Sequence, residues 1–144
     1  LAAQPETLER EGFLLVHGSP RDPIWEYVTS TPVARAAMAA MQTQAGLHGH
    51  THLPVAYIEE DGRLETMSPG SGSELKIEGR RVLLNPGSVG QPRDGIPTSG
   101  WMLLDTEAGT ARWRRTAYDI SDVQAAMTRL GLPERLVARL AYGL

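Results

Sequence analysis

Two short segments, each with an apolar residue or run leading into histidine and glycine, constrain the fold of this chain most. Residues 13–18 read Phe-Leu-Leu-Val-His-Gly and residues 47–52 read Leu-His-Gly-His-Thr-His. A short apolar run between turn-forming residues is typical of a strand buried on both faces of a sheet. We therefore expect residues 13–16 to form a central strand and residues 47–48 the next short strand, both presenting histidines at a sheet edge.

A helix is expected between these two strands. Thr31 is a suitable N-cap, Pro32 suits the first helical position, and Gly46 can end the helix. Apolar residues recur between these points at helical spacing. Strand, helix and strand in this order predict half of an α/β layer.

The remainder of the chain has the pattern of antiparallel strands followed by two helices. Asp61-Gly62 predicts a hairpin turn, residues 69–73 a flexible Gly/Ser loop, and residues 85–95 a long turn-forming loop. The expected strands are residues 55–58, 74–77, 81–84, 101–104 and 111–117. These strands suggest a second, mostly antiparallel sheet.

Two helices are expected at the C-terminal end. Ser121 and Gln124 form a capping box for the first helix, Gly131 ends it, and Pro133 begins the second. Together with the preceding strands, they complete a mixed α/β pattern.

Composition restricts the class of protein. The 144 residues suffice for one domain or part of one, and a net charge of -3 gives no reason to expect nucleic-acid binding. Without cysteine, neither a disulfide nor a thiolate metal site is possible. No apolar stretch has the length of a membrane span, so we expect a cytoplasmic protein. The chain opens with Leu1 instead of methionine, which indicates a fragment, a processed chain or a late start of the numbering.

His17, His50 and His52 are the candidate metal ligands. Neutral imidazole binds zinc, manganese, iron and nickel. In a turn, His50 and His52 can flank two ions, with Gly49 allowing the backbone to approach closely. A pair of ions suits phosphoester hydrolysis. Taken alone, a histidine before glycine is also typical of an ordinary turn, and three residues are fewer ligands than two ions need.

Three segments together resemble a known family. Residues 16–20 read Val-His-Gly-Ser-Pro, residues 49–54 read Gly-His-Thr-His-Leu-Pro, and residues 84–95 read Leu-Asn-Pro-Gly-Ser-Val-Gly-Gln-Pro-Arg-Asp-Gly. They resemble the later half of a bacterial calcineurin-like metallophosphoesterase, most of all the YfcE-type and diadenosine-tetraphosphatase-like branch. The resemblance extends to about Asp119. It implies an α/β fold, the C-terminal part of a four-layer α/β/β/α sandwich with a di-metal centre between sheet edges.

The resemblance also implies an activity and its cofactors. His17 and His50 would share one divalent ion and His52 would bind the other, with Mn, Fe, Ni or Zn as the metals. A metal-bridging hydroxide would hydrolyse a small phosphomonoester, phosphodiester or dinucleoside polyphosphate.

The family's earlier Asp-x-His, Gly-Asp-x-x-Asp and Asn-His phrases are absent from this sequence. We therefore expect residues 1–144 to be the C-terminal portion of one metallophosphoesterase domain, inactive alone and partnered by the N-terminal half of the same protein. The sequence leaves open a non-catalytic metal-binding or interaction module. A zinc amidohydrolase ranks last, because the β-rich remainder leaves no room for a β/α barrel.

Arg21 and Arg93 are candidate substrate-binding residues. Both stand in Pro-Arg-Asp contexts, and a guanidinium beside a di-metal site can bind phosphate through two hydrogen bonds. The alternative is that each arginine fixes its own loop.

Other residues are expected to be structural. His48 is interpreted as a partly buried strand residue and Asn85 as a turn cap. Trp101 and Trp113 suit a sheet face or the core. Trp25 and Tyr27 could line a base-binding surface, but packing is favoured for both.

Overall fold

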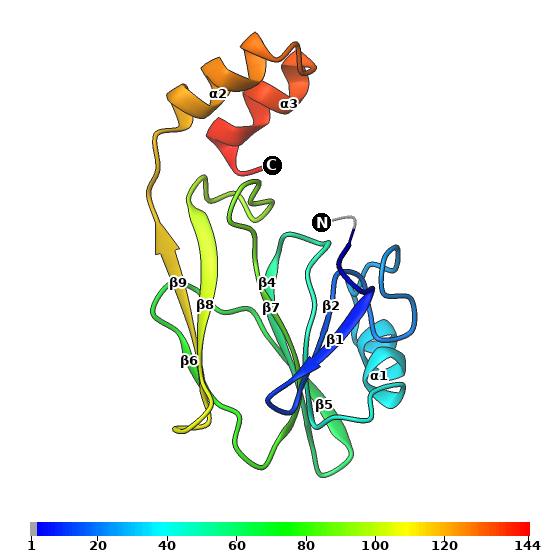
Figure 1. Ribbon diagram of the computed structural model, residues 1–144. Coiled ribbons are helices and arrows are strands. Elements are labelled where there is room, and N and C mark those ends of the chain that lie inside the picture. The colour runs from blue at the N-terminus through cyan, green and yellow to red at the C-terminus, as the bar shows by residue number, and fades with distance from the viewer. Residues whose placement is uncertain (1–2) are drawn as a thin grey trace.

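The computed structural model describes residues 3–144, so the two residues that open the chain, including Leu1, lie outside it. It shows a mixed α/β fold (Figure 1), as predicted. The elements in chain order are β1 (Thr7–Arg10), β2 (Phe13–Val16), α1 (Thr31–Ala39), β3 (Ala45–Leu47), β4 (Pro54–Glu60), β5 (Arg63–Met67), β6 (Glu74–Lys76), β7 (Arg81–Pro86), β8 (Ser99–Asp105), β9 (Thr110–Thr116), α2 (Ile120–Arg129), α3 (Glu134–Ala138) and the 3₁₀ helix η1 (Arg139–Tyr142).

The larger sheet has six strands in the order β1-β2-β3-β7-β4-β5. Within it, β2, β3 and β7 run parallel to one another, whereas β1, β4 and β5 pair antiparallel with their neighbours. Parallel strands place their carboxyl ends at the same edge of a sheet. The segments that follow β2, β3 and β7 therefore leave the sheet side by side.

The two faces of this sheet are covered by different layers. Along β7, Leu83 faces α1 and packs with Met38 and Val28, whereas Val82 and Leu84 face the smaller sheet. The smaller sheet is antiparallel, in the order β6-β9-β8. The two sheets lie face to face (Figure 1), and Trp113 of β9 is buried in the core that they share. The alternation of side chains along β7 thus builds an α/β/β stack.

Helices α2 and α3 lie beyond the end of the smaller sheet, not over its outer face (Figure 1). The outer face of β8 accordingly leaves Trp101 and Leu103 exposed. Of the two tryptophans expected on a sheet face or in the core, Trp113 is a core residue and Trp101 a sheet-face residue. No helix within residues 3–144 has the length and apolar character needed to span a membrane.

Strand β2 is not central, contrary to the prediction. The short strand β1 pairs along its outer side, and β2 is the second strand from the edge. Only Phe13 in β2 is buried, while residues 14–16 are half-buried. Strand β1 was not predicted, because its four residues, Thr-Leu-Glu-Arg, are all exposed and carry no alternating apolar pattern.

Helix α1 begins and ends differently from the prediction. Its N-cap is Ser30, with Thr31 as the first helical residue, and it ends at Ala39. Gly46 lies inside β3 instead of ending the helix. A Cβ atom at Gly46 would lie 3.0 Å from Met41 Cε and 3.1 Å from Leu83 Cδ1. A side chain at residue 46 would therefore require Met41 and Leu83 to shift by a few tenths of an ångström.

The capping box predicted for α2 is also absent. The N-cap is Asp119, whose side chain accepts a hydrogen bond from the backbone N–H of Asp122. Ser121 lies in the first turn and donates to the Asp119 carboxylate, with 2.6 Å between Oγ and Oδ1. A carboxylate caps a helix as well as a hydroxyl does, so Asp119 and Ser121 compete for the N-cap position of α2. Gly131 follows the helix with a φ of 71°, as expected of a C-terminal stop.

The strand segments are confirmed, but β4, β5 and β7 join the larger sheet, so only β6, β8 and β9 form the second antiparallel sheet that was expected to hold all the later strands. Asp61 and Gly62 form the β4–β5 turn with φ angles of 50° and 73°. Strands β6 and β7, although adjacent in sequence, lie in different sheets. The Gly/Ser loop between β5 and β6 is hydrogen-bonded to β9, since the N–H of Gly72 lies 2.9 Å from the carbonyl oxygen of Trp113. This loop links the two sheets.

Candidate metal centre

The three candidate histidines leave the larger sheet at the carboxyl ends of neighbouring parallel strands. His17 follows β2 directly, and His50 and His52 lie in the loop after β3. The N–H of Gly49 donates to the carbonyl oxygen of His17 across 2.9 Å, which continues the strand pairing into the loops. The parallel pairing therefore brings together residues that are far apart in the sequence.

The loop after His17 is tightly folded. The N–H of Gly18 donates to the Pro23 carbonyl oxygen, and that of Ser19 to the Asp22 carbonyl oxygen. A Cβ atom at Gly18 would lie 2.6 Å from the Asp22 carbonyl oxygen, so only glycine fits. The His-Gly phrase is thus explained by backbone packing immediately beside the imidazole.

His17 and His50 face each other directly. Nε2 of His17 lies 2.8 Å from Nδ1 of His50, and the two rings are 4.6 Å apart at an interplanar angle of 63°. Imidazole nitrogens bind zinc at roughly 2.0–2.1 Å, so two nitrogens this close suit adjacent ligands of one ion. These two residues form the part of the predicted site that the fold brings into contact.

His52 is held by a different contact. Its Nδ1 lies 2.6 Å from the carbonyl oxygen of Gln91. Because a carbonyl oxygen only accepts, Nδ1 carries the proton and Nε2 keeps its lone pair. A histidine that binds metal is commonly oriented in this way by a carbonyl on its other nitrogen. His52 makes no hydrogen bond to His17 or His50, which is compatible with its assignment to a second ion.

The backbone of this loop adopts an uncommon conformation. The φ angles are 59° at His50 and 60° at His52, in the left-handed region that side chains other than glycine rarely adopt. Two such residues in one loop cost free energy and persist only where the surroundings enforce them. The sequence did not reveal this, because neither residue is a glycine.

Asn85 supplies much of that enforcement. The side chain is fully buried, and its Nδ2 donates to the Gly49 carbonyl oxygen at 2.8 Å and to Thr51 Oγ1 at 3.0 Å. Its Oδ1 accepts from the N–H of Gly87 at 2.9 Å, as expected of a turn cap. The indole of Trp113 donates to the Asn85 carbonyl oxygen at 2.9 Å. One asparagine thus connects the histidine loop, the following turn and the core.

Burial favours the neutral form of two of these imidazoles, those of His50 and His52. It lowers the pKa of His50, with a further contribution from the charge of His17. Burial also lowers the pKa of His52, and the charge of Arg93 acts in the same direction. A neutral imidazole is the form that binds a metal ion. The donor set, its protonation and its facing nitrogens therefore fit a divalent cation.

His48 is buried, and its Nδ1 lies 3.5 Å from Nδ2 of Asn85. It lies directly after β3, where its N–H donates to the Leu84 carbonyl oxygen. Burial lowers the pKa of His48 to about 4. The interpretation of His48 as a buried residue of the strand region is therefore supported.

The two candidate arginines have different surroundings. Arg21 forms an ion pair with Glu26, which also accepts a hydrogen bond from Ser19. Its partner is therefore not the adjacent aspartate, and it fixes the loop after His17. Arg93 lies beside His52, its N–H 3.4 Å from the His52 carbonyl oxygen, and its guanidinium donates to the Gln91 side chain. A substrate-binding role remains a prediction for both.

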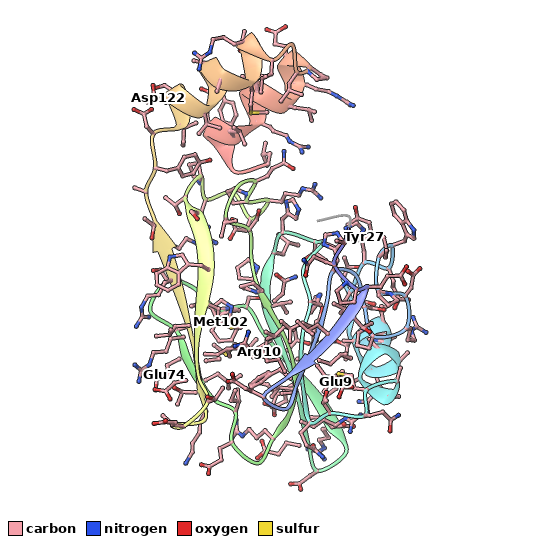
Figure 2. All side chains as sticks on the ribbon, viewed as in Figure 1. Glu9, Arg10, Tyr27, Glu74, Met102 and Asp122 are labelled. Atoms are coloured by element: carbon pink, nitrogen blue, oxygen red, sulfur yellow. The ribbon has the colours of Figure 1, made fainter. Side chains whose placement is uncertain are left out.

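Two aromatic residues near the site, Trp25 and Tyr27, have large exposed fractions. Tyr27 stacks on the His50 ring at a centroid distance of 3.8 Å, although 47% of the residue is exposed. In Figure 2 Tyr27 lies on the right, near the upper end of the larger sheet and below α2 and α3. Trp25 is 74% exposed, so the packing interpretation was wrong for Trp25. Nothing in the sequence signals the stacking of Tyr27 on His50, because the two residues lie on separate loops.

No carboxylate among residues 3–144 joins these histidines to complete a metal site. Across residues 3–144, no group of three or more His, Asp, Glu or Cys side chains is arranged to hold a metal ion. The structure thus brings His17 and His50 into contact but does not gather them with His52 into one group of three ligands.

Comparisons with known proteins agree with the fold. The family model of the calcineurin-like phosphoesterase superfamily domain matches residues 2–109. A crystal structure of a metallophosphoesterase from Sphaerobacter thermophilus is 38% identical in sequence and superimposes with a TM-score of 0.95 over 100% of this chain. A hypothetical protein from Pyrococcus horikoshii OT3, 20% identical, shares the fold over 99% of the chain with a TM-score of 0.68.

A protein sequence from Methanocaldococcus jannaschii, described as uncharacterized, is 31% identical over 139 residues. The chain spans 54% of that protein, 60% of the Sphaerobacter chain and 52% of the Pyrococcus chain. Members of the matched family generally use divalent metals. With the family model covering most of its length, this chain belongs to the calcineurin-like phosphoesterase superfamily.

Proposed function

We propose that this chain is the C-terminal portion of a metal-dependent phosphoesterase and supplies one side of its di-metal centre. The observation that carries the proposal is the contact of 2.8 Å between His17 Nε2 and His50 Nδ1 at the edge of the parallel strands. Two imidazoles with facing nitrogens at the edge of a sheet are suited to one cation.

His17 and His50 would hold one divalent ion and His52 a second, with Mn, Fe, Ni or Zn as the candidates. When bound, such a pair activates a water molecule and neutralises the phosphoryl oxygens of the substrate. The remaining ligands would come from an N-terminal segment of the same protein. That segment is the partner that we propose for residues 1–144.

The other residues of the site position these imidazoles and the substrate. The Gln91 carbonyl oxygen keeps the proton of His52 on Nδ1, so that Nε2 is free. Asn85 holds the loop between His50 and His52. Arg93, beside His52, would bind a phosphoryl oxygen. Small phosphomonoesters, phosphodiesters and dinucleoside polyphosphates, as in the YfcE-type branch, are the proposed substrates.

Hydrolysis of bis-p-nitrophenyl phosphate by the intact protein with Mn²⁺ tests this function. We expect the rate to fall at least a hundredfold in His50→Ala, while Mn²⁺ binding measured by calorimetry weakens in parallel. Glu65→Ala, an exposed position on β5, serves as the matched control and should leave both measurements unchanged. Equal rates for the wild type and His50→Ala would contradict the proposal.

A non-catalytic metal-binding module is the second candidate. It is favoured by one observation: the family's Asp-x-His and Gly-Asp-x-x-Asp phrases, which would supply carboxylate ligands, are absent from this sequence. The same experiment separates the two candidates. If the intact wild-type protein binds Mn²⁺ through His50 but hydrolyses no phosphoester, the binding module is the correct description.

A further inference from the structure

The loop that follows His17 carries two exposed aromatic side chains, Trp25 and Tyr27. Trp25 is 74% exposed, compared with 39% for Trp101 and 2% for Trp113. A tryptophan side chain is mostly buried in folded proteins, because removing its large apolar surface from water is favourable. The exposure of Trp25 therefore leaves a large planar surface available to a ligand.

Hydrogen bonds within this loop fix the backbone on both sides of Trp25. The side chain of Asp22 accepts from the backbone N–H of Trp25 at 3.0 Å and from that of Ile24 at 3.3 Å. Glu26, between the two aromatic residues, forms an ion pair with Arg21. Trp25 is thus exposed on a backbone that is already held in place, so little loss of backbone freedom would oppose the binding of a ligand.

Both aromatic residues lie next to the candidate metal ligands. The ring of Tyr27 stacks on that of His50 with 3.8 Å between centroids, while 47% of the residue stays exposed. Trp25 adjoins the backbone after His17, since a Cβ atom at Gly18 would lie 3.1 Å from the Trp25 backbone nitrogen. In Figure 2 Tyr27 lies near the upper end of the larger sheet, where the segments with His17 and His50 leave their strands. An aromatic surface therefore borders the candidate metal centre.

Trp25 differs from the other two tryptophans in its contacts. The indole N–H of Trp101 donates to the Thr116 hydroxyl across 2.9 Å. That of Trp113 donates to the Asn85 carbonyl oxygen, also across 2.9 Å. Within residues 3–144, the indole N–H of Trp25 makes no hydrogen bond, and the residue belongs to neither core cluster. Trp25 thus has neither the burial nor the hydrogen bond of a structural tryptophan.

We propose that Trp25 and Tyr27 bind the base of a nucleotide while its phosphoryl group lies at the candidate metal centre. The inference rests on the proposed function and selects one class among its substrates, namely nucleoside phosphoesters and dinucleoside polyphosphates. Every nucleobase has a planar face that stacks on an aromatic side chain. Because the aromatic surface and the imidazoles adjoin, a single molecule would contact both. No covalent step is assigned to either aromatic residue.

Binding of AMP and of ribose 5-phosphate to the intact, metal-free protein, measured by calorimetry, tests this inference without relying on activity. The two probes share the ribose and the phosphate, and only AMP carries a base. We expect the wild type to bind AMP about tenfold more tightly than ribose 5-phosphate. Trp25→Ala should reduce this preference to about twofold. Trp101→Ala, which removes an exposed tryptophan from the smaller sheet, is the matched control and should keep the preference.

Tryptophan fluorescence gives a second readout, one that a merely structural role of Trp25 would not change. Stacking of adenine on the indole should quench part of the emission in the wild type and in Trp101→Ala. Trp25→Phe keeps an aromatic face, so it should keep most of the preference for AMP while it loses the quenching. Thermal unfolding followed by circular dichroism verifies that each variant is folded.

Equal wild-type affinities for AMP and ribose 5-phosphate, or a preference for AMP that is unchanged in Trp25→Ala, would overturn the inference. Failure of the proposed function differs, since it shows as absent hydrolysis or an Mn²⁺ affinity that does not depend on His50. The two failures are separable, because the metal-free titrations measure recognition of the base and the Mn²⁺ titrations measure the imidazoles.

Discussion

The side-chain amide of Asn85 donates a hydrogen bond of 3.0 Å to the hydroxyl of Thr51, the residue that separates the two histidines with left-handed backbone. The same amide binds the Gly49 carbonyl oxygen on the other side of His50. Asn85 therefore spans the strained part of the loop. We interpret it as the residue that holds the candidate ligands in place before any ion binds.

Replacing Asn85 should accordingly cost both stability and metal affinity. Asn85→Ala removes two donated bonds and one accepted bond at a fully buried position, and we expect a loss of roughly 3 kcal/mol in the free energy of unfolding. Urea denaturation measures this loss. Thr51→Val removes a single hydroxyl of similar shape and should cost about 1 kcal/mol. If the two variants are equally stable, Asn85 does not have the central role assigned to it.

The left-handed backbone at His50 predicts that the glycine variant at this position is more stable than the alanine variant. At a φ of 59°, glycine fits without strain but alanine does not, so His50→Gly should be more stable than His50→Ala by about 1 kcal/mol. The comparison is made by urea denaturation of the metal-free protein. In strand β5, where the backbone is extended, Glu65→Gly should instead be less stable than Glu65→Ala. The same order at both positions would show that His50 carries no backbone strain.

The buried His48 should make stability depend on pH. Its pKa is about 4 in the folded protein, below the ordinary value of 6.5, because burial disfavours the charged ring. Below pH 6.5 the unfolded chain therefore binds a proton that the folded chain does not, and folding loses stability as the pH falls toward 4. The loss from this residue levels off near roughly 3 kcal/mol.

His48→Leu should remove that part of the pH dependence. Near pH 7 the variant should be at least as stable as the wild type, because Nε2 of His48 is buried without a hydrogen-bond partner in the described chain. The difference between the two proteins should grow between pH 6.5 and pH 4, as measured by denaturation at several pH values. Parallel stability profiles for the two proteins would show that His48 is not the titrating group.

The stacking of Tyr27 on His50 predicts an effect on metal binding. The rings lie 3.8 Å apart at an angle of 27°, so Tyr27 limits rotation of the imidazole. We expect Tyr27→Ala to weaken Mn²⁺ binding about tenfold, in line with the loss of outer-shell support at other metal sites. Tyr27→Phe keeps the ring and should bind Mn²⁺ nearly as well as the wild type. If removing the hydroxyl weakens binding as much as removing the ring, stacking is not the cause.

Local patterns predicted the strands best where apolar residues alternate with polar ones, or where turn-forming residues such as Asp-Gly separate two strands. The Asp61-Gly62 turn and the hairpin of β8 and β9 follow the prediction closely. Strand β1 was missed because its side chains are exposed and its pairing with β2 depends on the neighbouring strand. The end of α1 was misplaced because the role of Gly46 depends on Met41 and Leu83, which approach it only in the folded chain.

The sequence by itself determined which metal-binding groups the chain can offer. It provides three imidazoles that follow apolar strands, it provides no thiolate, and its ligands are too few for two ions. It could not determine which nitrogens meet, because His17 and His50 are joined only by the parallel pairing of β2 with β3. Nor could it show that Asn85 holds the histidine backbone. Such contacts depend on the packing of distant segments, whereas local propensity acts only along the chain.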